Sequence, residues 1–247
     1  MENIEKPNQL ELKEQADVSL SKAKEIILNS IPNDEIVSIY VKGSYVQDEL
    51  QPDSDVDVVV ILKSEEYLLA VYELTEKFGK TTKPPFQIVA YTLEELQTGK
   101  WSSNRTKTPT TISAFVKHLD QFPLLYGSKP EGKLFTRTDI KDLTALISAF
   151  EKSFLPDFEK GIFKFSEIVK SVMWLTEREQ RALGIVPDYS WQKLSDSIKD
   201  ENHIIHLALK LRRQKEVSKE EQAVFMEKLK NYLSSLKEKY QKENDKK

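Results

Sequence analysis

The sequence predicts an α+β fold in which a domain with a mixed sheet precedes a bundle of helices. Apolar runs with the length and spacing of strands are confined to the first half of the chain, whereas apolar residues at helical spacing occur in both halves. A loop with two glycines, residues 127–132, separates the halves. The order helix, strand, strand, helix, strand, followed by helices alone, is typical of a mixed α+β domain joined to a helical domain.

The first half is predicted to hold the sheet. A helix over residues 10–31 ends at Pro32, and strands follow over residues 36–41 and 55–62. The second strand contains five consecutive apolar residues, which indicates burial on both faces. The other elements expected here are a helix over 64–78, a strand over 86–91, a short helix that begins with the capping box of Thr92 and Glu95, a helix over 112–119 and a strand over 122–126.

The second half is predicted to be helical throughout. Its last helix opens with another capping box, Ser218 with Glu221. The expected helices cover residues 139–154, 165–183, 190–198, 203–213 and 218–240. We therefore place two domains at residues 1–134 and 135–247.

Composition narrows the class of protein. A chain of 247 residues with 39% hydrophobic and 31% charged residues is long and apolar enough for two folded domains. The absence of cysteine excludes disulfides and thiolate metal sites. No apolar run approaches the roughly 20 residues of a membrane span, and residues 1–6 lack the features of a secretory signal. We expect a cytoplasmic protein with no membrane partner.

The net charge gives little general attraction to nucleic acid. Binding to DNA or RNA depends on Lys and Arg that neutralise phosphates, and this chain carries a formal net charge of −3. We expect no extended nucleic-acid partner, so a nucleotide would have to be held locally.

Two short motifs point to such a local site. Asp55 and Asp57 alternate along a predicted strand, which would place both carboxylates on one face, where Mg²⁺ would offset their repulsion. Gly43 and Ser44 follow the preceding strand: glycine permits a close backbone approach to a ligand, and serine offers a hydroxyl and an N–H to a phosphate oxygen. If the two strands are neighbours, a triphosphate could lie between turn and carboxylates.

Residues 42–57, KGSYVQDELQPDSDVD, resemble the signature of the polymerase-beta-type nucleotidyltransferases. That superfamily includes antibiotic nucleotidyltransferases and the small adenylyltransferases of toxin–antitoxin pairs. The resemblance implies an Mg²⁺-dependent enzyme that transfers a nucleoside monophosphate, which we expect to be AMP from ATP, to a hydroxyl group. The resemblance also implies that Asp55 and Asp57 bind the metal and are catalytic. It implies that Gly43, Ser44 and Ser54 bind the nucleotide.

A looser resemblance extends into the second half. Trp174-Leu175, the segment LGIVPD at residues 183–188 and Trp191 resemble the helical domain of the streptomycin/spectinomycin adenylyltransferases. This implies an aminoglycoside-like acceptor and a role in antibiotic resistance. Trp101 and Asp188 are candidates for binding the acceptor, although loop anchoring is the stronger interpretation of Trp101 and a position at a helix start explains Asp188 equally well.

One position departs from the resemblance. Many relatives carry a third carboxylate on the strand after the Asp pair, as a metal ligand or general base, and the aligned residue here is Gln87, whose amide accepts no proton near neutral pH. The base could come from the helical half, where Glu167, Glu177 and Glu179 are candidates, or the acceptor could need little help. Alternatively, the protein is a catalytically weakened nucleotide-binding or partner-binding module. A protein adenylyltransferase of the toxin–antitoxin type is a further alternative.

Overall fold

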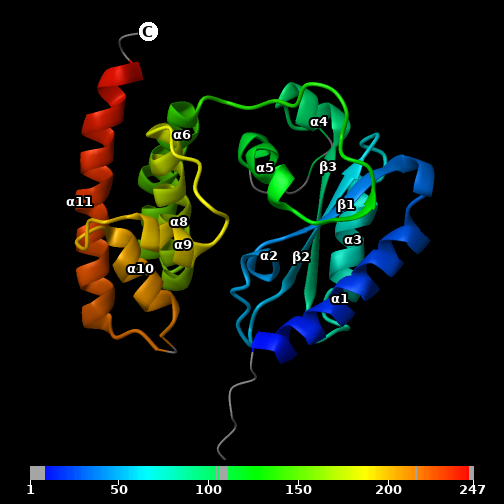
Figure 1. Ribbon diagram of the computed structural model, residues 1–247, viewed down its shortest axis with the longest axis horizontal. Helices are drawn as coiled ribbons and strands as arrows, with labels where there is room; N and C mark the ends of the chain where they lie inside the picture. Colours follow the sequence, from blue (N-terminus) through cyan, green and yellow to red (C-terminus); the bar gives the residue numbers. More distant parts are fainter. Residues whose placement is uncertain (1–8, 104, 106–110, 215, 245–247) are drawn as a thin grey trace, which may run out of the picture. The chain divides into compact units, whose positions relative to one another are not determined.

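The computed structural model divides into two compact units, Met1–Thr136 and Arg137–Lys247, and each is described by itself (Figure 1). It describes residues 9–103, 105, 111–214 and 216–244. Residues 1–6, on which the interpretation about a secretory signal rests, lie outside these ranges. No helix within the described ranges has the length and apolar character needed to cross a membrane.

The described residues of the first unit form a mixed sheet of four strands in the order β3-β2-β1-β4. β1 pairs antiparallel with both β2 and β4, whereas β2 and β3 run parallel. The strands are β1 (Ile36–Lys42), β2 (Val56–Leu62), β3 (Phe86–Thr92) and β4 (Leu124–Gly127). The helices of this unit include α1 (Gln9–Ser30), α2 (Ser44–Gln47), α3 (Leu68–Phe78), α4 (Leu93–Thr98) and α5 (Ile112–His118).

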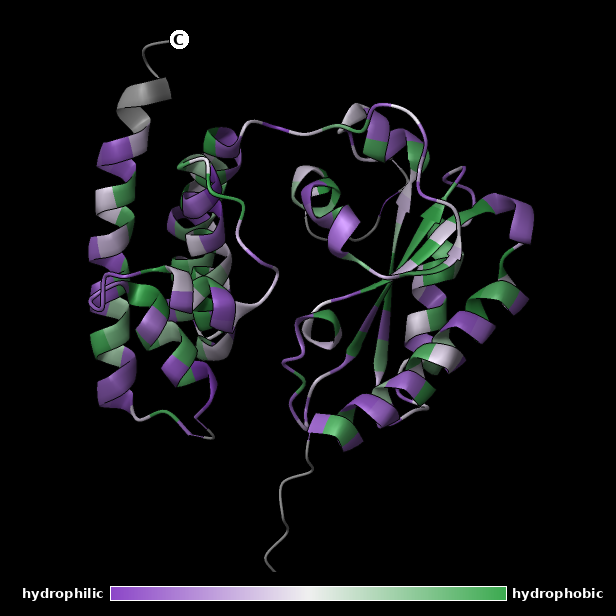
Figure 2. Ribbon diagram, viewed as in Figure 1, coloured by the Kyte–Doolittle hydropathy of each residue, from purple (hydrophilic) through white to green (hydrophobic). Residues whose placement is uncertain are grey.

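β2 is the centre of the core, as its apolar sequence predicts. Every residue of β2 except Asp57 is buried, and the strand is mainly green in Figure 2. Alternate side chains of a strand point to opposite faces. Val58 and Val60 pack in one cluster with apolar residues of α1 and α3. On the other face, in the row of Ile61, Tyr91 stacks on Phe115 of α5 with 4.4 Å between ring centroids.

The opposite end of this second face carries polar side chains. Lys42 is the register partner of Asp57 across β1 and β2, and Asp57 is the register partner of Gln87 across β2 and β3. Because paired residues of neighbouring strands share a face, these three side chains form a row across the sheet. Gly43 follows this row at the end of β1.

The second unit is helical, in agreement with the sequence. An apolar cluster joins its helices, and α8 carries the largest share of buried residues, including Val172 and Met173. The long helix α11 is red in Figure 1. The helices are α6 (Asp139–Ala149), α7 (Leu155–Glu159), α8 (Phe165–Ala182), α9 (Trp191–Ser197), α10 (Ile204–Arg212) and α11 (Lys219–Asn244). Both predicted capping boxes are present: Thr92 with Glu95, and Ser218 with Glu221.

The helix predicted over residues 139–154 is not a single α-helix. The α-helix ends at Ala149, a π-helix covers Phe150–Phe154, and α7 follows with Pro156 in its first turn. Proline lacks the N–H that would continue the ladder, and its ring clashes with the carbonyl four residues earlier. The wider π turn ahead of Pro156 accommodates both effects, so the chain continues in helical form where the sequence predicted a stop.

Candidate functional site

Gly43 holds a backbone conformation that only glycine adopts readily. Its φ is 75° and its ψ is −152°, a region in which a Cβ atom is strained. Ser44 then opens the short helix α2, which was predicted only as a turn. N–H groups in the first turn of a helix have no carbonyl one turn earlier to donate to, so those of Ser44 and Tyr45 are suited to donate hydrogen bonds to an anion.

The structure brings Gly43 and Asp57 together. A Cβ atom built on Gly43 would lie 2.3 Å from Oδ2 of Asp57, so the carboxylate fills the space that a side chain at 43 would need. Asp57 is half-buried, and its carboxylate lies directly beside the turn that leads into Ser44. A phosphate-sized anion at the turn and a cation at the carboxylate would therefore be neighbours.

Lys42 is the part of this site that the sequence reasoning missed. Its Nζ lies 3.3 Å from Oδ1 of Asp57, and each side chain is only 18% exposed. One oxygen of the carboxylate thus faces an ammonium group, and the other faces Gly43. The available signal was the antiparallel pairing of the strands that flank the motif, which sets Lys42 opposite Asp57.

Gln87 occupies the position on β3 beside Asp57. Its side chain is exposed, and its register places it on the same face. The amide can donate or accept hydrogen bonds, but it has no charge to bind a cation strongly and takes up no proton near neutral pH. The sheet therefore presents one acidic group, not two, at this level of β2 and β3.

Asp55 and Ser54 lie in the loop that leads into β2. The strand begins at Val56, so the prediction that Asp55 is its first residue was wrong by one position. The N–H of Val56 donates to the carbonyl of Pro85, which is the first ladder contact with the β3 side, while Asp55 precedes it and is exposed. The hydroxyl of Ser54 accepts a hydrogen bond from the N–H of Gln51 at 2.8 Å, so Ser54 closes a tight loop ahead of the acidic pair.

The oxygen donors here fit Mg²⁺ bound together with a nucleotide. Among the described residues, no group of three or more His, Cys, Asp or Glu side chains could enclose a metal ion. Mg²⁺ usually keeps several waters and is held by one or two carboxylates plus substrate phosphates. Asp57 offers one such hard oxygen ligand next to the turn, and Asp55, two positions earlier, is the second carboxylate that the sequence predicts.

Trp101 lies in a loop anchored by a buried ion pair. Nη2 of Arg105 is 2.5 Å from Oε2 of Glu95, with the two side chains 1% and 2% exposed. The guanidinium also lies 4.8 Å from the centroid of the Trp101 ring, which stacks in turn on Tyr91. These contacts give Trp101 a role in holding the loop. The pKa of Glu95 is below its usual value, since hydrogen bonds from Arg105 and from the N–H groups of Ser102 and Thr92 outweigh the effect of burial.

Each acidic candidate of the helical unit has a partner within that unit. The carboxylate of Glu167 accepts a hydrogen bond from the N–H of Lys164 at the start of α8. Glu177 is buried in an ion pair with Arg181. Asp188 pairs with Lys193 at 2.9 Å, three residues ahead of α9 and thus not at its start.

Glu179 lies in a network of its own on α8. Burial acts to raise its pKa, but hydrogen bonds with His203 and Tyr232 prevail, so the pKa lies below the usual value. A carboxylate stabilised in this way is a weak proton acceptor. Of the three glutamates proposed as a base, Glu167 is the one whose side chain is exposed.

Comparison with known proteins identifies the first unit. Residues 20–108 match the family model described as "Nucleotidyltransferase domain", a range that includes the turn at Gly43, the carboxylate of Asp57 and the amide of Gln87. The first unit is a nucleotidyltransferase domain. This match agrees with the polymerase-beta-type motif of residues 42–57. A search of curated proteins finds no match to the sequence.

The fold also resembles that of solved structures. The crystal structure of spectinomycin adenyltransferase AAD(9) from Enterococcus faecialis with ATP and spectinomycin is 14% identical, with a TM-score of 0.56 over 90% of this chain and 98% of that chain. This supports a nucleotidyltransferase domain followed by helices. A crystal structure of a toxin–antitoxin with AMP-PNP is 18% identical over 62% of this chain and 97% of that chain, and its TM-score of 0.32 is too low to indicate a shared fold.

Proposed function

We propose that the protein transfers a nucleoside monophosphate, AMP from ATP, to a hydroxyl group of a small molecule in the presence of Mg²⁺. The observation that carries this proposal is the contact between the carboxylate of Asp57 and the glycine turn at 43, inside a nucleotidyltransferase domain. A buried strand and a glycine-specific turn hold the two groups, so little reorganisation is needed when substrate binds.

Each residue of the site has a separate role in this proposal. Gly43 allows the triphosphate to approach the backbone, Ser44 donates its hydroxyl and N–H to a phosphate oxygen, and Ser54 closes the loop ahead of the acidic pair. Asp55 and Asp57 would hold Mg²⁺, which when bound neutralises charge on the phosphate oxygens.

The reaction itself is an in-line displacement at the α-phosphorus. The acceptor oxygen forms a bond to phosphorus, the bond from phosphorus to the bridging oxygen of the β-phosphate breaks, and pyrophosphate leaves with that electron pair. The hydroxyl proton passes to a base, for which Glu167 remains the candidate with an exposed carboxylate. Holding nucleotide and acceptor in this geometry is the main contribution that a protein makes to such a transfer.

We propose an aminoglycoside-like compound as the acceptor and the helical unit as its binding domain. The fold similarity to an adenyltransferase solved with ATP and spectinomycin supports this choice of acceptor. Asp188 is an exposed carboxylate and stays a candidate for contact with a cationic acceptor, in competition with its pairing to Lys193.

Gln87 favours a second candidate function. With an amide beside Asp57 instead of a carboxylate, the site lacks the group that would bind metal most strongly or take the acceptor proton. The protein would then bind nucleotide without efficient turnover.

Labelled ATP separates the two functions. Purified protein is incubated with ATP labelled at the α-phosphate, Mg²⁺ and a panel of aminoglycosides, and label on the acceptor is measured. We expect transfer that is lost in Asp57→Ala and kept in Asp34→Ala, an exposed aspartate at the far end of β1. ATP binding without transfer to any acceptor would favour the second function, and absence of ATP binding would exclude both.

A further inference from the structure

The pair formed by Lys42 and Asp57 places a positive charge directly at the carboxylate in the centre of the site. Nζ of Lys42 lies 3.3 Å from Oδ1 of Asp57, and both side chains are 18% exposed, so the ion pair is largely shielded from water. The pairing of β1 with β2 fixes the two residues opposite each other. The second oxygen of Asp57 lies against Gly43. Lys42 thus occupies one side of the carboxylate at the centre of the site.

The net negative charge of the side chains around Asp57 is also small. Lys42 carries a positive charge, Asp57 a negative charge and Gln87 none, and together with Asp55 the four side chains have a net charge of −1. Two-metal sites hold ions about 3.5–4 Å apart, and carboxylates that contact both ions offset their charge. Here an ammonium group already faces one oxygen of Asp57, and Gln87 supplies no further charge.

We infer that Lys42 takes the place of one of two cations, so that the site binds a nucleotide with a single divalent ion. The inference rests on the proposed function, because it concerns the same nucleotide site. An ammonium group is a compact point charge that offsets negative charge without needing ligands of its own. Held at Asp57, it supplies fixed positive charge beside the turn for phosphate, repels a second divalent ion and leaves one oxygen of the carboxylate for the first.

The test counts bound ions. Mn²⁺ replaces Mg²⁺ and is titrated into the full-length protein with the α,β-methylene analogue of ATP, with protein in excess over nucleotide. Free Mn²⁺ is measured by electron paramagnetic resonance. We expect one Mn²⁺ per nucleotide complex in the wild type and in Lys42→Arg, which keeps the charge. In Lys42→Met, which removes the charge at similar length, we expect the affinity for a second Mn²⁺ to rise at least tenfold.

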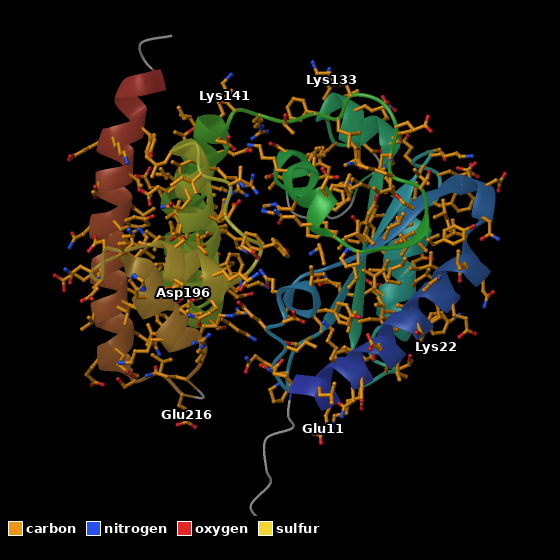
Figure 3. The ribbon with its side chains drawn as sticks, viewed as in Figure 1. Glu11, Lys22, Lys133, Lys141, Asp196 and Glu216 are labelled. Atoms are coloured by element: carbon orange, nitrogen blue, oxygen red, sulfur yellow. The ribbon has the colours of Figure 1, made fainter. Side chains whose placement is uncertain are left out.

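Lys22→Met is the matched control. Lys22 forms an exposed ion pair with Glu25 on α1, at 2.9 Å, and is labelled in Figure 3. It should bind one Mn²⁺ like the wild type, and thermal unfolding checks that each variant is folded.

Three results would overturn the inference in different ways. Two Mn²⁺ ions in the wild-type complex would refute it, whatever the state of the variants, and would leave the proposed function intact. An unchanged count and affinity in folded Lys42→Met would also refute it alone. Failure of the wild type to bind the ATP analogue at any Mn²⁺ concentration would refute the proposed function, and the inference would fall with it.

Discussion

Gly43→Ala tests the contact on which the site depends. The new Cβ would lie 2.3 Å from Oδ2 of Asp57, whereas ordinary contact begins at 3.4 Å, so the carboxylate must retreat by about 1 Å. A displacement of that size at a reacting centre costs about 100-fold in rate. Strain at the φ of 75° adds about 1–3 kcal/mol of destabilisation, which corresponds to a fall of roughly 2–12 °C in Tm.

Two other glycines separate strain from contact. Gly161 and Gly184 also have positive φ, at 74° and 81°, but a Cβ on either meets nothing within 4 Å. Alanine at these positions should cost about 1–2 kcal/mol and leave ATP affinity unchanged. Tm is measured by differential scanning fluorimetry and ATP affinity by calorimetry. If Gly43→Ala binds and transfers AMP like the wild type, Asp57 and the turn do not act together.

Two further predictions concern Gln87 and the buried pair of Glu95 and Arg105. Gln87→Glu places a carboxylate beside Asp57, so the Mg²⁺ concentration that half-saturates ATP binding should fall at least threefold; a rise in calorimetric titrations would contradict this role for the position. Glu95→Gln should lower the free energy of unfolding at pH 7 by about 3 kcal/mol, because Arg105 is left buried without its counter-charge. The folded-state pKa of Glu95 lies below 4.5, so its contribution is complete above that pH and is lost as the pH falls through the lowered pKa. Urea unfolding at pH 7 and near pH 3 should therefore show a smaller difference between wild type and variant in acid, and an equal difference would refute the assignment.

The order of apolar runs along the chain predicted the fold class, and the spacing of one motif predicted that Gly43 and Asp57 lie close together. Gly43 and Asp57 lie fourteen positions apart, and the short apolar run directly after Asp57 is typical of a buried strand. Neighbouring strands then bring the two residues together. The sequence could not show that Asp55 precedes the strand, since a one-residue shift at a strand end depends on ladder contacts such as that of Val56 with Pro85.

Interactions between distant residues were harder to predict. Lys42 ends an apolar strand, and from the sequence its side chain could as well point to solvent; the register of β1 with β2 shows that it lies opposite Asp57. Arg105 belongs to a polar segment with no periodic pattern, and its burial depends on contacts with the carboxylate of Glu95 and the carbonyl of Ala90 in β3. The π turn ahead of Pro156 was likewise not predictable, because the spacing of apolar residues does not distinguish a π turn from an α-helix.

β2 couples the thermal stability of the site to that of the whole domain. Asp57 is the second residue of a strand whose remaining side chains are all buried and which pairs on both sides. Backbone amides in such a strand exchange with deuterium mainly when the domain unfolds globally. Heating should therefore abolish nucleotide binding in the same cooperative transition that unfolds the sheet, and no loss of binding should precede that transition.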